Sequence, residues 1–178
     1  MSLDINLIYK EKIEGLAKNK TDEVFYNSSE EHAQVVVNAI AKNAEHEIKI
    51  LCCNMCSKIS NNEDYLKSVK GFLSGNKDRK IQILFTKYSD EFPQKPIAGV
   101  FKEYADQVEI KKWDSAEKIT LKGEPVNFTV SDDRAYRMET DIEKRLAFGN
   151  FNNPEGAKNL SSVFDELFNS TFTHQINI

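Results

Sequence analysis

The sequence predicts an α/β domain in which helices flank both faces of a mixed sheet. The first half is expected to be built from βαβ units, and the second half from a β-meander followed by a helix. Three observations support this fold class. Apolar strand-like runs alternate with helical patterns up to residue 113. Short alternating patterns separated by turns follow in residues 118–151. An amphipathic helical pattern comes last, and residues 1–178 are expected to form a single domain.

The first elements are predicted to be helices. Residues 6–18 carry apolar residues at helical spacing, and residues 1–23 are expected to form an N-terminal helical extension. Ser28 and Glu31 then fit a capping box, in which each side chain satisfies a free amide at the start of a helix. The apolar positions of this second helix share one face: Ala33, Val36, Val37, Ile40 and Ala44.

Three strand patterns follow, beginning at Ile48 (IKILCCN), Lys80 (KIQILFTKY) and Val108 (VEIKKW). The first two are apolar on both faces, which is typical of strands in a sheet that is covered on both sides. Helical patterns over residues 63–75 and 92–107 separate the three strands. A helix between successive strands predicts βαβ crossovers, and therefore a parallel arrangement.

The second half changes to short strands joined by turns. The segments KITLKG, PVNFTVSD, RAYRMET and KRLAFGNF are each expected to form one strand of a meander. Asn153 is predicted to cap the final helix, with Pro154 in its first turn. The apolar stripe of this helix contains Ala157, Leu160, Phe164, Leu167 and Phe168.

The overall charge argues against several classes of protein. The net charge is -4 and the isoelectric point is about 5.5, whereas nucleic-acid-binding domains usually present a basic surface. No run approaches the about 18 apolar residues of a membrane span. The first residues lack the apolar run of a secretory signal, so a cytoplasmic location without membrane insertion is expected. The opening Met1–Leu3 is compatible with a cloning remnant.

The three cysteines, Cys52, Cys53 and Cys56, end a strand pattern. A zinc site needs about four ligands, and no second cysteine pair or suitably spaced histidine supplies the others. A thioredoxin-like redox motif would open a helix, which this segment does not. We therefore expect reduced thiols of structural type, with no metal and no cofactor.

The order of these elements resembles one half of the phospholipase D superfamily, which includes nucleases and single-half proteins that dimerise. The segments that carry the resemblance are NSSEEHAQVVVNAIAKNAEHEIKIL, VNFTVSD and AFGNFNNPE, and it covers about residues 24–170. The resemblance implies a phospholipase D-like fold. It also implies a homodimer whose two-fold axis lies near residues 125–132.

The family's catalytic strand reads His-x-Lys, four further residues and Asp. Histidine and lysine face the same phosphate, where histidine attacks phosphorus and lysine neutralises developing charge. With Asp132 at the acid position, Pro125 occupies the histidine position and Asn127 the lysine position. Asn150 matches the asparagine of the downstream Gly-Ser-x-Asn segment. Because proline cannot attack phosphorus, the resemblance implies a degenerate site in which Asp132 and Asn150 are vestigial.

Several side chains remain candidates for binding a ligand. Arg137 has a planar fork that suits phosphate, but it could instead form a structural ion pair with Glu139 or Asp132. His32 could approach the site from its helix, although a surface histidine is the simpler interpretation. The expected ligand-binding set is Asn127, Thr129, Asp132, Arg137, Glu139 and Asn150.

The acidic residues around this segment have a simpler explanation than a metal site. Asp132 and Asp133, with Glu139 and Asp141, could offer oxygen ligands to a divalent cation. Paired acids are also common at tight turns, so Asp132 and Asp133 are better explained as turn residues.

Three functions remain open from the sequence, which leans away from an enzyme. The first is a catalytically inactive module that binds a phosphate-bearing ligand, with nucleic acid a weaker possibility, or a protein partner. The second is a phosphodiesterase or nuclease with a rearranged site built on Asp132, Arg137 and Glu139. The third is a structural or regulatory subunit whose former site is packed shut.

Overall fold

The computed structural model describes residues 4–178, so Met1–Leu3 and the suggested cloning remnant lie outside the described residues. The strands are β1 (Phe25–Asn27), β2 (Glu47–Cys52), β3 (Lys80–Phe85), β4 (Val108–Trp113), β5 (Thr120–Leu121), β6 (Glu124–Pro125), β7 (Asn127–Ser131), β8 (Ala135–Asp141), β9 (Leu146–Asn150) and β10 (Thr173–Gln175). The helices are α1 (Ile5–Lys18), α2 (Glu30–Asn43), α3 (Lys58–Asn61), α4 (Glu63–Gly75), α5 (Pro96–Glu103) and α6 (Pro154–Phe168), with a short 3-10 turn, η1 (Phe92–Gln94).

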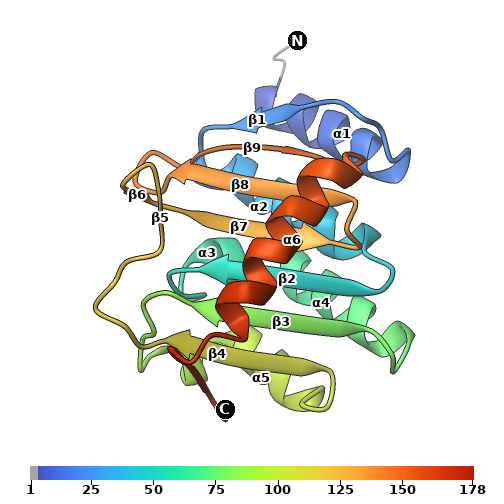
Figure 1. Ribbon diagram of the computed structural model, residues 1–178. Helices are drawn as coiled ribbons and strands as arrows, with labels where there is room; N and C mark the ends of the chain where they lie inside the picture. Colours follow the sequence, from blue (N-terminus) through green and yellow to red (C-terminus); the bar gives the residue numbers. More distant parts are fainter. Residues whose placement is uncertain (1–3) are drawn as a thin grey trace.

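Eight of the strands form one mixed sheet in the order β1-β9-β8-β7-β2-β3-β4-β10. Figure 1 shows α6 lying alone across one face of this sheet, with the earlier helices on the opposite face. The predicted fold class, a mixed sheet with helices on both faces, is therefore confirmed.

Strands β2, β3 and β4 are parallel neighbours, as the βαβ pattern predicted. The side chains of β2 and β3 are largely buried on both faces, which explains their continuous apolar sequences. Ile50 and Ile83 belong to the core beneath α4 and α5, whereas Leu51 and Leu84 contact the α6 side.

Strands β7, β8 and β9 form the predicted meander, and β7 joins the parallel half by pairing with β2 in antiparallel orientation. Strands β5 and β6 form a small separate hairpin, so the segment KITLKG, which was predicted to be a strand of the meander, lies outside it. The mixed sheet therefore changes from parallel to antiparallel at the β2–β7 boundary. This boundary places the strand that resembles a catalytic strand in the middle of the sheet.

The two edge strands were not predicted. Strand β1 pairs with β9, and β10 pairs with β4, both in antiparallel orientation. Each is only three residues long, which is too short for an alternating pattern to be recognised. Through these strands, segments near both ends of the chain join the same sheet.

Helix α2 starts one residue later than predicted. Its N-cap is Ser29, whose hydroxyl oxygen accepts a hydrogen bond from the backbone N–H of His32 at 3.1 Å. The predicted capping box of Ser28 and Glu31 is therefore wrong, because the chain is still extended in β1 and turns only after it. Glu31 lies instead in the first helical turn, where a carboxylate favours the helix dipole.

Helix α6 begins as predicted and is held to the sheet by apolar and polar contacts. Asn153 caps the helix by accepting a hydrogen bond from the N–H of Gly156 at 2.8 Å. The buried ammonium of Lys49 donates to Ser161 at 2.7 Å and to Asp165 at 2.9 Å. The apolar contacts of α6 come from Ala157, Phe164 and Phe168, with Leu160 and Leu167 at their margin. Within residues 4–178, no helix has the length and apolar character needed to span a membrane.

Candidate functional site

The candidate site lies where β2 and β3 end and β7 begins. Strand register aligns Asn27 of β1, Ala147 of β9, Glu139 of β8 and Asn127 of β7 in one row across the sheet. This row lies at the carboxyl ends of the parallel strands, which is where open α/β sheets bind their ligands. Three of its four side chains are polar.

A buried ion pair forms the centre of this row. The guanidinium Nη2 of Arg137 lies 3.0 Å from Oε1 of Glu139, and the two side chains are only 6% and 3% exposed. Arg137 also donates from Nε to the amide oxygen of Asn27 at 2.9 Å. Burial lowers the pKa of the Arg137 guanidinium, and the neighbouring Glu139 carboxylate opposes that shift. The structural ion pair that the sequence offered for Arg137 is therefore formed with Glu139.

Hydrogen bonds extend this pair into a network. The second carboxylate oxygen of Glu139 accepts from the amide nitrogen of Asn127 at 2.8 Å. The amide oxygen of Asn127 accepts from the backbone N–H of Cys53 at 3.1 Å. Arg145 approaches Glu139 at 3.7 Å from the solvent side, with a side chain that is 28% exposed. We call Asn27, Asn127, Arg137 and Glu139 the buried network.

Two aromatic rings border the buried network. The rings of Tyr9 on α1 and His32 on α2 stack with their centroids 3.7 Å apart. The Tyr9 hydroxyl donates to the carbonyl of Tyr26 at 2.9 Å. Burial raises the pKa of Tyr9 to about 12, and the positive charge of Arg137 partly opposes this rise. His32 is therefore held by a stacking contact near this end of the sheet. Helix α1 covers part of the same end.

Asp132 lies at the other end of the strands, beside the start of β2, which it stabilises. Its carboxylate accepts backbone N–H groups from Glu45 at 2.8 Å, His46 at 2.8 Å and Glu47 at 3.0 Å. Asp132 and Asp133 have φ angles of 54° and 46°, so both central residues of the β7–β8 turn are left-handed. Such turns match the twist of a hairpin and favour short polar residues. The turn explanation of this acidic pair is supported.

Asn150 also lies away from the buried network. Strand register places it opposite Tyr136, near the start of β8, whereas Glu139 lies toward the end of that strand. Its amide donates to Asp22 at 2.7 Å and accepts from the N–H of Asn152 at 2.8 Å.

The expected ligand-binding set is thus divided between the two ends of the strands. Asn127, Arg137 and Glu139 are brought together in the buried network. Thr129 lies two residues after Asn127 on β7, where it pairs with Arg137. Asp132 and Asn150 lie toward the other end of the strands, so the six residues do not surround one ligand.

The acidic residues that the sequence offered as metal ligands lie apart. The acidic pair Asp132 and Asp133 precedes β8, whereas Glu139 and Asp141 lie toward its end, so the four carboxylates do not converge. Across residues 4–178, no three histidine, cysteine or acidic side chains are placed to hold a metal ion.

The three cysteines are free, half-buried thiols close to the network. Burial, together with the neighbouring thiols and the Glu139 carboxylate, raises the pKa of Cys52 well above its ordinary value. A thiol that remains protonated is a poor nucleophile.

Sequence patterns missed three contributors to the site: Asn27, Tyr9 and Arg145. Asn27 ends a three-residue strand, and its role depends on pairing with β9, which is distant in sequence. The only local signal is its polar amide two residues before the N-cap Ser29. Tyr9 reaches the site through the packing of α1, which no short motif encodes.

Structural comparisons identify the architecture as a phospholipase D-like fold. The archaeal chromatin protein TrmBL2, whose structure is described as showing a novel mode of DNA binding, aligns with a TM-score of 0.62 and 14% identity over 96% of this chain and 61% of that one. NucT from Helicobacter pylori aligns with a TM-score of 0.60 and 12% identity, covering 89% of this chain and 99% of that one. Phosphatidylserine synthase from Haemophilus influenzae aligns with a TM-score of 0.54 and 10% identity, covering 86% and 39%.

These likenesses establish the fold. The chain therefore has the phospholipase D-like fold that its sequence resembled. It spans less than two thirds of the TrmBL2 chain. No protein-family model matches the sequence, and no curated protein matches it either.

Proposed function

We propose that this chain is a non-catalytic phospholipase D-like module that recognises a phosphate-bearing ligand. The non-catalytic part is supported by the bonding of Asn127 and by the residue at position 125. Asn127 stands where the resemblance places lysine, and its amide is bonded to Glu139. Pro125, at the position of the nucleophile, cannot attack phosphorus and lies exposed at the end of β6.

The electrostatics of the network also disfavour phosphodiester hydrolysis. The charge of Arg137 is neutralised by Glu139, and its Nε is engaged by Asn27. A phosphate placed at this end of the sheet would find the charges of Arg137 and Arg145 already offset by the Glu139 carboxylate. The positioned cations that stabilise a phosphoryl transition state are therefore not available from these residues.

The rearranged phosphodiesterase is the second candidate and is less well supported. It requires Asp132 to act together with Arg137 and Glu139. Asp132 is instead held at the opposite end of the strands by three backbone N–H groups. The purely structural or regulatory subunit is consistent with the closed network, and it differs from our proposal only in lacking a ligand.

The names of the structural neighbours support a phosphate-bearing ligand. TrmBL2 is described as binding DNA, and phosphatidylserine synthase is named for a phospholipid. The net charge of -4 favours a small ligand over nucleic acid, because duplex binding relies on neutralising many phosphates.

The proposal includes self-association, as the family resemblance implied, together with a cytoplasmic location and a further protein partner. The expected two-fold axis lies near residues 125–132, where Pro125 and the β5–β6 hairpin are exposed. Light scattering at micromolar concentration should give the mass of a dimer. A monomer mass under those conditions would exclude this part of the proposal.

Turnover assays test the non-catalytic assignment. A chromogenic phosphodiester, plasmid DNA and single-stranded DNA are incubated with the protein, with and without divalent metal. We expect no hydrolysis in any condition. Turnover that is present in the wild type and lost in both Arg137→Ala and Asp132→Ala would show that the fold has rebuilt a working site.

A further inference from the structure

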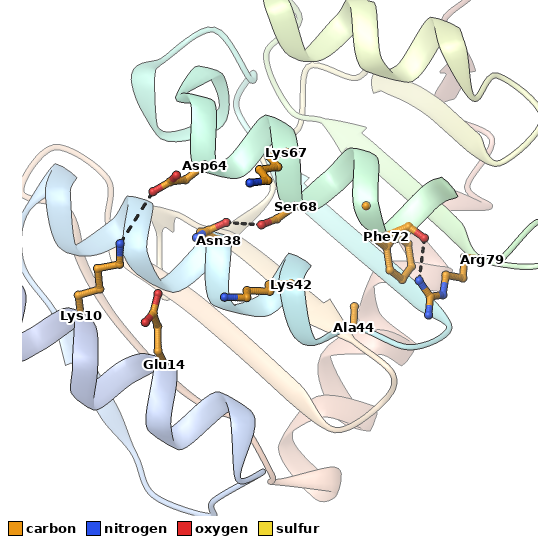
Figure 2. Close-up of a pocket in the computed structure, with 11 residues that line it drawn as sticks. Lys10, Glu14, Asn38, Lys42, Ala44, Asp64, Lys67, Ser68, Phe72 and Arg79 are labelled. Atoms are coloured by element: carbon orange, nitrogen blue, oxygen red, sulfur yellow. Dashed lines mark hydrogen bonds and ion pairs between the residues drawn. The ribbon is translucent and has the colours of Figure 1, made fainter. Parts of the chain in front are cut away.

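A groove on the helix side of the sheet lies between α1, α2 and α4, apart from the buried network (Figure 2). Its volume is about 440 Å³, which falls within the range of small-molecule sites. Its floor and walls come from helical residues and from the turn before β3. The lining residues are Lys10, Glu14, Asn38, Lys42, Ala44, Asp64, Lys67, Ser68, Gly71, Phe72 and Arg79.

The groove is positively charged although the chain is acidic. Four basic side chains line it against two carboxylates, in a protein whose net charge is -4. Lys10 lies 4.0 Å from Asp64, so this pair is mutually neutralised across the groove. Within residues 4–178, Lys42 and Lys67 have no ion-pair partner. The two lysines, from α2 and α4, lie on either side of the hydrogen-bonded Asn38 and Ser68 in Figure 2.

Arg79 is held rigidly beside Phe72, at the end of the groove away from Lys10. Its Nε donates to the carbonyl of Glu45 at 3.0 Å, and its Nη1 donates to the carbonyl of Phe72 at 2.9 Å. The guanidinium also lies over the Phe72 ring, 5.2 Å from the centroid. Two fixed bonds leave the Nη2 donors without a partner in the described part of the chain. A guanidinium oriented in this way loses little conformational entropy when it binds an anion.

A polar pair between the lysines supplies a further donor. The Ser68 hydroxyl donates to the amide oxygen of Asn38 at 2.6 Å, which fixes the orientation of that amide. The amide nitrogen of Asn38 then has no partner among residues 4–178. Gly71 lies beside this pair on α4, and a Cβ built there meets no atom within 4 Å, so the groove is open at this point.

From these contacts we infer that the groove binds a small, polar, phosphate-bearing molecule, with its phosphate between Lys42 and Lys67, beside the amide nitrogen of Asn38. Unpaired cations with spare N–H donors suit a phosphate dianion. The lining offers only Ala44 and Phe72 as apolar surface, so the rest of the ligand is hydrophilic and extends along the groove toward the Nη2 donors of Arg79. This inference rests on the proposed recognition function and gives it a location away from the former catalytic strand.

Calorimetric titration tests the inference, with inorganic phosphate, tripolyphosphate and adenosine monophosphate as probes. Binding should be saturable and should weaken as ionic strength rises. Adenosine monophosphate should bind more tightly than inorganic phosphate if the groove holds an organic body as well. Lys42→Ala and Lys67→Ala should each weaken binding about tenfold, which is typical of a charged hydrogen bond. Lys70→Ala is the matched control, because Lys70 lies on α4 but pairs with Glu103.

Gly71→Leu tests the location without removing any charge. The substitution adds a side chain to the groove at an exposed helical position, where it should also favour the helix. We expect the phosphate probes to lose their binding while the melting temperature is kept. Gly99→Leu is the steric control, since Gly99 is an exposed glycine of α5 whose added Cβ also meets open space.

The outcomes separate this inference from the proposed function. Wild-type affinity in Lys42→Ala, Lys67→Ala and Gly71→Leu would exclude the groove, whether or not phosphate binds elsewhere. Binding that is lost only in Arg137→Met, while the circular dichroism spectrum of that variant stays that of the folded protein, would place the ligand at the buried network. That result would overturn the inference but keep phosphate recognition. No binding of any probe by the wild type at low ionic strength would overturn the location and the ligand class, whereas the absence of turnover would still stand.

Discussion

Removal of Arg137 should destabilise the fold strongly, because it leaves a buried carboxylate without its main partner. The Glu139 side chain is 3% exposed, and in Arg137→Met it keeps only Asn127 and the more distant Arg145. Breaking a buried ion pair from one side typically costs about 3–5 kcal/mol. Since small domains are stable by about 5–15 kcal/mol, this loss is a large part of the total.

Urea denaturation, followed by circular dichroism, measures the free energy of unfolding. Arg145→Met serves as the control, because its guanidinium faces the same carboxylate at 3.7 Å but is partly solvated. A pair of this kind contributes less than about 1 kcal/mol. The double variant Arg137→Met/Glu139→Gln should show a coupling energy of about 0.5–3 kcal/mol, because the two side chains are in direct contact.

The result that would refute this reasoning is a small effect. If Arg137→Met costs less than about 1 kcal/mol, Glu139 is adequately solvated or neutralised without Arg137. Arg137 would then be free to serve a ligand, and the closed network would no longer argue against catalysis.

Three further variants test other parts of the structure. Gly149→Ala would place a Cβ against the carbonyl oxygen of Tyr136 and should cost about 1–3 kcal/mol in urea denaturation; an unchanged stability would contradict this close approach. Asp133→Gly should raise the melting temperature by removing left-handed strain and a buried carboxylate oxygen without a partner within residues 4–178; a lowered melting temperature would contradict it. Because folding raises the pKa of Tyr9 from 10.0 to about 12, its contribution to stability is complete below pH 10 and is lost as pH rises to 12. Tyr9→Phe should reduce this alkaline loss in a series of denaturation curves, and equal losses in both proteins would contradict the assignment.

Much of the fold could be predicted because its signals are local. The apolar runs beginning at Ile48 and Lys80 identified parallel strands, and Asn153 with Pro154 marked the start of α6. The capping-box motif favours Ser28 as the cap of α2, whereas Ser29 caps the helix in the structure. The competing influence was β1, a strand too short to be recognised from its sequence.

The candidate site was harder to predict because strand register determines it. The spacing of Arg137 and Glu139 placed them on one face, and their ion pair was among the expected possibilities. Their burial depends on partners that are distant in sequence, such as Asn27 at 110 positions from Arg137. The pattern also grouped Asn150 with these residues, whereas the pairing of β9 with β8 places it toward the other end of these strands.

The most direct test is a phosphorus NMR experiment on the wild-type protein mixed with a simple phosphodiester and adenosine monophosphate. Non-catalytic recognition predicts that the diester signal keeps its intensity while the monophosphate signal shifts or broadens with protein concentration. The shift should disappear in Lys42→Ala/Lys67→Ala. A diester signal that decays into a new product signal would contradict the central claim, because it would show that the fold still hydrolyses phosphodiesters.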